Sequence, residues 1–435
     1  MNNIPALWHK RLNFYIDHQS NDSTSSNIGI LDDKEEVAIQ PSRFGNYIYS
    51  SDSKQVSKKL ICYYTTQRDS LSRIRKHLGN ERSLRIKDIN AHLCTHLNVG
   101  IVEISNCSLV IDSDLILAFE ESNVLKLRNT KLKVMIWVGG ADESMGFKEM
   151  VASHTNRKRF IQSLKFTFEK YSLDGVDLDW EFPDGSNSER IHFMQLLHEI
   201  RREYQREHRT YLLSLAAAAP SVLVDMCYDV KMINENVDFV NLMTYDYHFY
   251  SKGTPYVGLN APLFARSNEV GFFSTLNIDY SVNYWIKKGL DPSKIIIGLP
   301  TYGHSFRLVN PFNSRFGAPA EDFGRVGVLG FVSYGEVCWF QKSNINVRIE
   351  FDTETCSPFL SSGLEWISYE NERSLECKAN YVKDNNFGGV MVFSLNTDDY
   401  QLTCVDNNES DRASGERDFP LLRKVHSILF QNTTN

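Results

Sequence analysis

Three acidic residues alternate with apolar residues in a short stretch near the middle of the chain. Asp177, Asp179 and Glu181 are each two positions apart in the sequence YSLDGVDLDWEF. Alternate residues of a β-strand point to one face, so we predict that the three carboxyl groups share a face. Like charges this close repel, and burial penalises them further, so their pKa values must separate. A protonated carboxyl beside an ionised one is suited to acid–base catalysis.

Metal binding is the main alternative for a cluster of acids, because hard cations also bind several Asp and Glu oxygens. The residues between these acids are apolar, unlike those of a glycine-rich calcium loop. The eight cysteines include no CxxC pair, which argues against a zinc ribbon or a thioredoxin-type site. We therefore predict a catalytic strand rather than a metal site.

The elements that must position these acids form a regular alternation of strands and helices after residue 58. Short β-branched apolar runs alternate with amphipathic stretches, which is typical of βα units. We predict eight strands, at Leu60–Thr65, His96–Ile104, Leu132–Val138, Gly175–Asp179, Tyr211–Ala218, Phe239–Thr244, Lys294–Leu299 and Gly388–Phe393. Helical spacing is clearest in Val151–Tyr171, Asn187–Glu207, Tyr280–Gly289 and Leu375–Asn385. Eight strand–helix pairs predict an α/β fold, a (β/α)8 TIM barrel whose strands end at the catalytic mouth.

Two connections are too long for simple loops. One is Tyr247–Asn277, and the other, about 303–385, contains strand-like pieces of its own. We interpret the second as a small α+β insertion between the seventh and eighth strands. The barrel with this insertion is assigned to residues 56–425.

The two ends of the chain are more polar than the barrel. Residues 1–55 are rich in Ser, Asn and Asp, so we expect a flexible arm. The alternative is an extended surface segment over Ile28–Pro41. Residues 405–435 form a C-terminal segment with a flexible tail, and its sequence LLRKVHSILF is expected to supply the last barrel helix.

Charge and hydropathy exclude two classes of partner. The formal net charge of −7 provides no basic field for nucleic acid or for anionic membranes. No stretch of about 18 apolar residues predicts a transmembrane helix. The first twenty residues also lack the apolar run of a signal peptide. Either a targeting segment is missing from this chain, or the protein stays inside the cell.

Five motifs resemble glycoside hydrolase family 18. YSLDGVDLDWEFP is similar to the DGxDxDWEYP signature of that family. KVMIWVGG, at Lys133–Gly140, resembles the strand that ends in SxGG, and MTYD, at Met243–Asp246, resembles the MxYD strand. IGLPTYGHSF and FGGVMVFSLNTDD resemble the seventh and eighth strands. Together the motifs cover about residues 59–404 in the family's order, and they imply the same barrel fold and the hydrolysis of a glycosidic bond.

The resemblance implies that the 2-acetamido group of the substrate acts as the nucleophile. Glu181 would protonate the glycosidic oxygen and later activate water. Asp179 would orient the acetamido group, and Asp177 would hold Asp179 and exchange a proton with it. Tyr245 would hydrogen-bond the acetamido oxygen. No metal or organic cofactor is required. The remaining predicted substrate-binding residues are Tyr63, Gly139, Gly140, Met243, Asp246, His304 and Phe393.

Several positions depart from the family pattern. Phe393 replaces the Trp that usually floors the central sugar subsite, Ala141 replaces a Trp after the two glycines, and another Trp is missing near Gln67. Each lost aromatic platform removes about 1–2 kcal/mol of sugar binding. Trp137 stands in place of the Ser of SxGG, and His304 in place of an Arg. We expect His304 to be a pocket or surface histidine rather than a base.

The resemblance also implies two disulfides, Cys62–Cys94 and Cys338–Cys404, with four buried reduced thiols as the alternative. Disulfides form in oxidising compartments, so we expect an extracellular or secretory protein despite the missing signal. Four N-glycosylation sequons are compatible with this location: Asn21, Asn106, Asn408 and Asn432.

Three activities are compatible with these features. The leading hypothesis is a monomeric chitinase-type hydrolase acting on chitin or chitooligosaccharides. The second is a chitinase-like lectin that binds the same sugars with little turnover, which the thinned aromatic platforms favour. The third is an endo-β-N-acetylglucosaminidase acting on N-glycans, against which the insertion before the eighth strand argues. The complete acid row favours hydrolysis.

Overall fold

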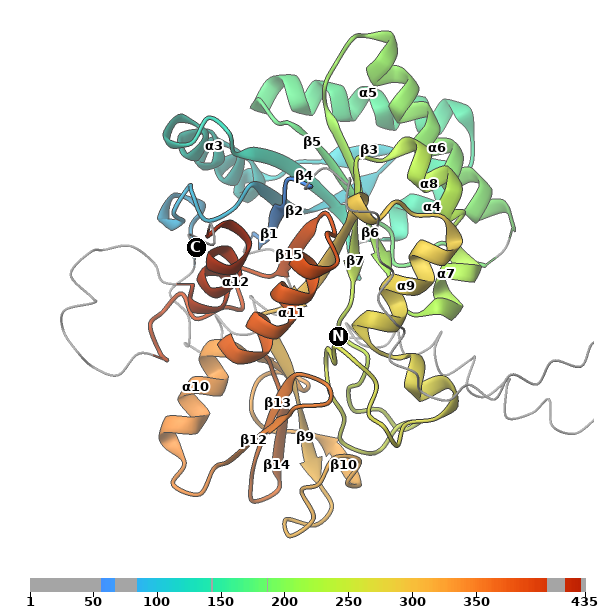
Figure 1. Cartoon of the computed structure of the whole chain (residues 1–435). Helices are drawn as coiled ribbons and strands as arrows, with labels where there is room; N and C mark the ends of the chain where they lie inside the picture. The colour runs from blue at the N-terminus through green and yellow to red at the C-terminus, as the bar shows by residue number, and fades with distance from the viewer. Residues whose placement is uncertain (1–55, 67–83, 142–143, 186, 405–418, 432–435) are drawn as a thin grey trace, which may run out of the picture.

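Eight parallel strands close into a barrel at the centre of the molecule (Figure 1). The computed structural model describes residues 56–66, 84–141, 144–185, 187–404 and 419–431. The ring runs β1-β15-β8-β7-β6-β5-β4-β2, and β2 pairs with β1 to close it. Its members are β1 (Lys59–Thr65), β2 (His96–Ser105), β4 (Lys133–Gly139), β5 (Gly175–Asp179), β6 (Leu212–Ala218), β7 (Phe239–Met243), β8 (Ile295–Pro300) and β15 (Gly389–Phe393). The predicted (β/α)8 barrel is confirmed, and every predicted strand ends within one residue of the observed one.

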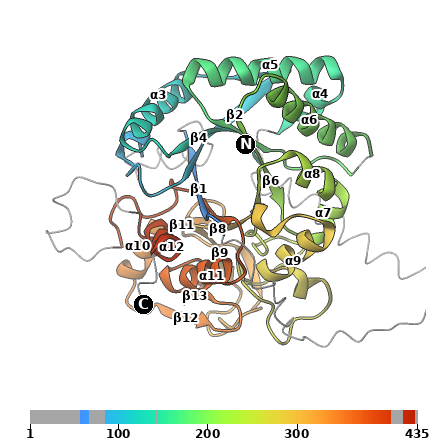
Figure 2. The same cartoon turned by 45° about the horizontal axis from the view of Figure 1, so that its top comes forward.

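Helices surround the strands, as the tilted view in Figure 2 shows. Their bounds are α3 (Ser113–Arg128), α4 (Met145–Val151), α5 (His154–Tyr171), α6 (Asn187–Arg206), α7 (Ser221–Cys227), α8 (Val230–Asn236), α9 (Ile278–Lys288), α11 (Glu372–Asp384) and α12 (Pro420–Phe430). The helix predicted over Val151–Tyr171 is wrong at its start, because α4 ends and α5 begins there. Ser153 is the N-cap of α5, and its side chain accepts a hydrogen bond from the backbone N–H of Asn156.

Short 3₁₀ turns and one hairpin complete the barrel layer. The turns lie at Ile86–Asp88, Gly271–Thr275 and Pro292–Lys294. The strand β3 (Ser108–Val110) pairs antiparallel with the end of β2. The sequence LLRKVHSILF lies in α12, whose apolar side chains Leu421, Leu422 and Val425 are buried.

Apolar side chains fill two separate layers of the barrel. The larger lies between the strands and the helices, and it includes Val176 and Leu178 of β5. The smaller lies inside the barrel and is largely aromatic, with Tyr63, Trp137 and Tyr245 among its members. Because side chains alternate along a strand, β5 turns its apolar residues outward and its aspartates toward this inner layer.

A second, antiparallel sheet lies in the connection between β8 and β15, next to the barrel in Figure 1. Its order is β10-β9-β14-β13-β12, and β11 also pairs with β9. The elements are β9 (Tyr302–Leu308), β10 (Ala320–Phe323), β11 (Phe331–Ser333), α10 (Tyr334–Ser343), β12 (Arg348–Asp352), β13 (Ser357–Ser362) and β14 (Glu365–Ser368). The predicted α+β insertion is therefore present.

Three disulfides link elements of the barrel and the insertion. Cys62–Cys94 and Cys338–Cys404 are the two bridges that the family resemblance implied. The third, Cys356–Cys377, joins two cysteines without a predicted partner.

Two predictions concern segments outside the described residues, namely the arm over 1–55 and the tail at 405–418 and 432–435. Across the residues that are described, no helix has the length and apolar character needed to cross a membrane.

Candidate active site

Asp177 lies fully buried on the inner face of β5, and side chains from three other barrel strands donate to its carboxylate. The Tyr63 hydroxyl from β1 donates to its Oδ2. Its Oδ1 accepts from Ser214 Oγ of β6 at 2.5 Å and from Asn241 Nδ2 of β7 at 2.9 Å. Burial raises the pKa of Asp177 to about 6, although these hydrogen bonds oppose the change. The carboxyl therefore takes up a proton at a higher pH than an exposed aspartate does.

Asp179 lies two residues further along β5 and has only one of its oxygens satisfied. The indole Nε1 of Trp137 donates to Oδ2 at 2.9 Å. The Oδ1 atom is buried and has no hydrogen-bond partner among the described residues. Burial, with the charge of Asp177 added, raises the pKa of Asp179 above its ordinary value. Two adjacent buried carboxyl groups with raised pKa values are expected to hold one proton between them near neutral pH.

Glu181 follows β5, where the chain leaves the barrel, and is partly exposed. Its backbone N–H donates to Ser144 Oγ at 3.0 Å, and that hydroxyl donates to the carbonyl of Gly140. The neighbouring Trp180 is buried and stacks on Phe147 in the outer layer. The acids and the apolar residues thus take opposite sides of this segment, as the alternation predicted.

Tyr245 lies just after β7 in the inner layer, near the acid row. Burial raises its pKa well above the usual value, and the charges of Asp179, Asp246 and Glu181 add to the effect. Its hydroxyl is therefore a hydrogen-bond donor at any physiological pH. Within the described residues, the thioether of Met391, 3.8 Å away, is the acceptor for this hydroxyl. A thioether is a weak acceptor, so the O–H can turn to a better one.

Asp246 follows Tyr245 and connects the barrel to the insertion. Its Oδ1 accepts hydrogen bonds from Tyr302 Oη and from His304 Nε2, each at 2.7 Å. The backbone N–H of Asp246 donates to Asn260 Oδ1 at 2.8 Å. His304 therefore holds Asp246, and its role as a pocket histidine rather than a base stays a prediction.

Gly139 and Gly140 lie against the main chain of β5. Both have left-handed backbone angles, with φ of +93° and +114°, that favour glycine. A Cβ at Gly139 would meet the carbonyl of Asp179 at 2.2 Å, and the N–H of Gly140 donates to that carbonyl at 2.7 Å. These glycines shape the floor beside Asp179.

Phe393 and Met243 complete the predicted set. Phe393 ends β15, with its ring 5.8 Å from that of Tyr245 and 5.6 Å from those of Tyr63 and Trp137. Met243 ends β7 and is partly buried against both apolar layers. The predicted catalytic and substrate-binding residues thus lie on barrel strands, directly after them or, for His304, on β9 against Asp246. Gln67 lies outside the described residues.

Sequence reasoning missed Ser214, Asn241 and Tyr302, and it treated Trp137 only as a departure from the family pattern. Ser214 and Asn241 are single polar residues in otherwise apolar strands, and both are fully buried. A buried polar side chain needs a partner, so their positions at mid-strand were a usable signal. Nothing in the sequence indicated that Asp177 would be the hydrogen-bond partner of both Ser214 and Asn241.

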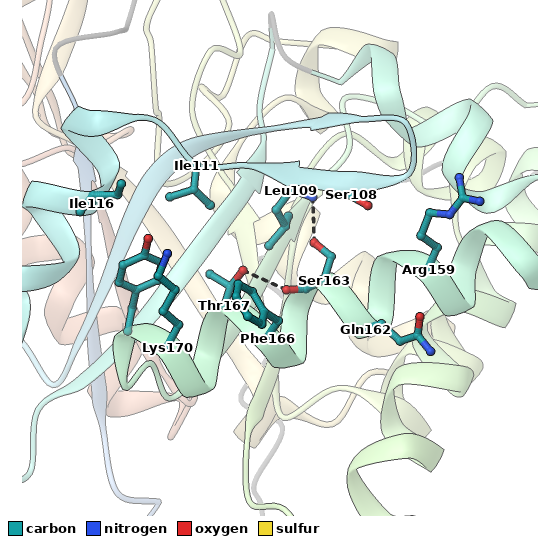
Figure 3. A pocket seen from close by; sticks show the side chains of 11 residues that line it. Ser108, Leu109, Ile111, Ile116, Arg159, Gln162, Ser163, Phe166, Thr167 and Lys170 are labelled. Carbon is teal, nitrogen blue, oxygen red and sulfur yellow. Dashed lines mark hydrogen bonds between the residues drawn. The ribbon is translucent and has the colours of Figure 1, made fainter.

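A separate groove lies on the outside of the barrel, between the β2–β3 hairpin and α5 (Figure 3). It has a volume of about 540 Å³ and is lined by Leu109, Ile116, Phe166 and Lys170, among others. The hairpin is tied to α5 by a hydrogen bond from the Leu109 N–H to Ser163 Oγ. No residue of the acid row lines this groove, so it is not part of the candidate site.

Comparison with known proteins identifies the family. The model of Glycosyl hydrolases family 18 matches residues 59–398. Chitinase-3-like protein 2 of Homo sapiens is 33% identical over 382 residues, which are 85% of this chain and 92% of that protein. Chitotriosidase-1 of Mus musculus is 34% identical over 385 residues, which are 85% of this chain and 78% of that protein.

Solved structures agree with this assignment. Two structures of YKL-39 have a TM-score of 0.76 and 30% identity, and the match covers 86% of this chain and all of theirs. One was solved in the presence of chitooligosaccharides, and the other describes human YKL-39 as a pseudo-chitinase with retained chitooligosaccharide binding. With a family model that spans the whole barrel, and with its acid row in place, the chain belongs to family 18 of the glycosyl hydrolases.

Proposed function

We propose that this chain hydrolyses β-1,4-linked N-acetylglucosamine oligomers, or accessible chains of the chitin type, by a substrate-assisted retaining mechanism. One observation carries the proposal. A buried pair of carboxyl groups with raised pKa values lies beside the partly exposed Glu181, and Asp179 Oδ1 has no partner within the described residues. An unsatisfied buried acceptor is costly, and the N–H of a substrate acetamido group is a donor that would satisfy it.

In the first step, Glu181 donates its proton to the glycosidic oxygen. The acetamido carbonyl oxygen attacks the anomeric carbon as the bond to the leaving oxygen breaks, forming an oxazolinium-like intermediate. Asp179 accepts a hydrogen bond from the acetamido N–H and stabilises the positive charge of the intermediate. Tyr245 donates a hydrogen bond to the acetamido oxygen. Asp177 is protonated while Asp179 is ionised, because two adjacent negative charges are unfavourable in a buried site.

In the second step, Glu181 acts as the base. It removes a proton from water, which attacks the anomeric carbon while the bond to the acetamido oxygen breaks. Two displacements at the same carbon retain its configuration. Tyr63, Met243, Phe393, Gly139 and Gly140 are proposed to surround the sugar, while Asp246 and His304 shape the side toward the insertion.

Turnover of fluorogenic di- and tri-N-acetylchitooligosaccharides tests this proposal. Removing a general acid typically costs 10²- to 10⁴-fold, so Glu181→Gln should lose about that much activity. Glu350→Gln is a matched control, because Glu350 lies on β12 of the insertion and pairs with Arg348 at 3.0 Å. Its turnover should equal that of wild type. Activity that survives Glu181→Gln would contradict the assignment.

Chitooligosaccharide binding with little turnover is the second candidate function. Phe393 and Ala141 in place of Trp favour it, since they leave less aromatic area for sugar stacking. Calorimetric binding of tri-N-acetylchitotriose by wild type, without any fluorophore release, would favour this lectin function over hydrolysis.

An extracellular or secretory location is also proposed, with chitooligosaccharide as partner and a monomeric state. Three disulfides support it, and Asn106 of a sequon is exposed at the turn between β2 and β3. Peptide mapping of natively produced protein without reduction tests the location. Free thiols at Cys62 and Cys94 would contradict it.

A further inference from the structure

The indole of Trp137 occupies the centre of the site, where the family pattern has a small residue. Trp137 is on β4, in register with Asp177 of β5, and only 2% of it is exposed. Its ring packs edge-on against Tyr63, with centroids 5.0 Å apart, and against Phe393 at 5.6 Å. The indole is thus enclosed by aromatic side chains and points its N–H at Asp179.

Two glycines make room for this ring. A Cβ at Gly100 would lie 2.7 Å from the carbonyl oxygen of Trp137 and 2.9 Å from its ring atom Cε3. A Cβ at Gly140 would lie 3.3 Å from Cζ2 of the indole. A glycine on the adjacent strand β2 and a glycine directly after β4 itself therefore leave room for a large side chain at position 137.

The consequence for Asp179 is that its two oxygens are no longer equivalent. Oδ2 is bound by the indole N–H at 2.9 Å, and Oδ1 is buried without a partner among the described residues. Trp137 has no acceptor atom in its ring, so it can only donate. The bond therefore favours an ionised Oδ2 and resists rotation of the carboxylate about its side-chain bonds.

We propose that Trp137 is a positioning residue of this enzyme: its N–H fixes Asp179 by Oδ2, so that Oδ1 alone is presented to the substrate acetamido group. This inference rests on the proposed substrate-assisted reaction. The family usually has a Trp at position 393, and the smaller Phe393 leaves space that the indole of Trp137 fills. The proposal gives the indole a second role, which is to orient Asp179.

The titratable groups around Asp179 limit the interpretation of pH effects. Asp177 lies on the same strand, Tyr63 comes from β1, Tyr245 follows β7, and Glu181 follows β5. Burial raises the pKa of both tyrosines well above the usual value, so they stay neutral across the working pH range. Tyr228, which follows α7, also interacts with the charge of Asp179, and burial raises its pKa in the same way. Burial raises the pKa of Asp177 to about 6 and the pKa of Asp179 above its ordinary value, so these two carboxyl groups titrate within that range.

Trp137→Phe keeps a ring in place and removes the N–H. Turnover should fall roughly tenfold with little change in KM, because the substrate still binds but its acetamido group is less well oriented. The acid limb of the pH profile of kcat should move up by about one pH unit, the size expected from losing a hydrogen bond to a charged group.

Trp285→Phe is the matched control. Trp285 is also fully buried and donates its N–H, but to the backbone carbonyl of Ala218 at 3.1 Å. This variant also loses one indole hydrogen bond, so it accounts for any general loss of stability, and its acid limb should stay where wild type has it. Equal pH profiles for the two variants would overturn the proposal.

The ¹⁵N-indole spectrum provides a second measurement, and this one does not depend on turnover. The Trp137 resonance is identified by its absence in Trp137→Phe or by elimination among the six tryptophans. Its chemical shift should change with pH at the titration midpoint of Asp179, and this change should be absent in Asp179→Asn. The resonance should also shift on addition of tri-N-acetylchitotriose, whereas the Trp285 resonance should do neither.

The two hypotheses fail in different ways. A protein that binds the trisaccharide, shows the coupled titration and has no turnover would refute hydrolysis while supporting the role of Trp137 in holding Asp179. A Trp137 resonance that does not respond to the titration of Asp179 would overturn that role, whatever the turnover.

Discussion

Replacing Asp177 by Asn should stabilise the fold at neutral pH. The carboxyl is fully buried, and burial raises its pKa from 3.8 to about 6. An acid whose pKa is raised by folding favours the folded state only while protonated, so stability is lost as pH rises from about 4 to about 6. The shift of about 2 pH units corresponds to about 3 kcal/mol above that range.

The amide introduced by Asp177→Asn would retain part of the hydrogen bonding. Its oxygen can accept from Ser214 and Asn241 as the Asp177 carboxylate does, and its NH₂ can donate to the Tyr63 oxygen. Rearranging this network costs about 1 kcal/mol. We therefore expect Asp177→Asn to be more stable than wild type by about 1–3 kcal/mol above pH 7, with turnover lost.

Melting temperatures from pH 4 to pH 8 test this expectation, because the difference between variant and wild type removes the contributions of all other groups. The variant should gain little at pH 4 and about 2–6 °C at pH 8. Asp174→Asn is the control from the same segment. Asp174 pairs with Lys126 at 2.7 Å and Lys133 at 3.4 Å, so losing its charge should lower stability. A difference for Asp177→Asn that does not change with pH would refute the reasoning.

Two further predictions concern the aromatic layer and a disulfide. Phe393→Trp alone should lower the free energy of unfolding by about 1–3 kcal/mol, because the larger ring overpacks against Trp137. The double variant with Trp137→Ser should regain most of this loss, which a double-mutant cycle of urea unfolding would measure. Additive effects of the two substitutions would contradict the contact. Replacing Cys62 and Cys94 together by Ala should lower the free energy of unfolding by about 3–4 kcal/mol, since their bridge closes a loop with a sequence separation of 32 residues. Unchanged unfolding of that variant in non-reducing buffer would show that the bridge contributes nothing.

The barrel and the acid row were predictable because both depend on local periodicity. The barrel strands are five to ten residues long and mostly apolar, which indicates burial on both faces, and helical spacing between them leaves few alternatives to a βα repeat. The alternation in β5 likewise settled which side chains share a face, since a slip of one residue would exchange its apolar residues and its acids between the outer and inner layers. The motifs then placed Glu181 and Tyr245 at the same end of the barrel.

The helix boundaries and the third disulfide were harder to predict from the sequence. Periodicity continues through the break between α4 and α5, and only the capping hydrogen bond of Ser153 divides them. Cys356 and Cys377 are 21 residues apart, with β13 and β14 between them, so their proximity depends on how the insertion folds back on α11.

By itself, the sequence determined the fold class and the face on which the acids lie, because these follow from residue spacing along single elements. Its motifs pointed to the family by resemblance, and the match of the family model over residues 59–398 then showed it. Only the tertiary structure decided how the acids differ from each other. The donors to Asp177 come from β1, β6 and β7, and the indole that binds Asp179 comes from β4. Closing the barrel brings these strands together around a buried space, and that enclosure raises both pKa values and leaves one oxygen of Asp179 unsatisfied among the described residues.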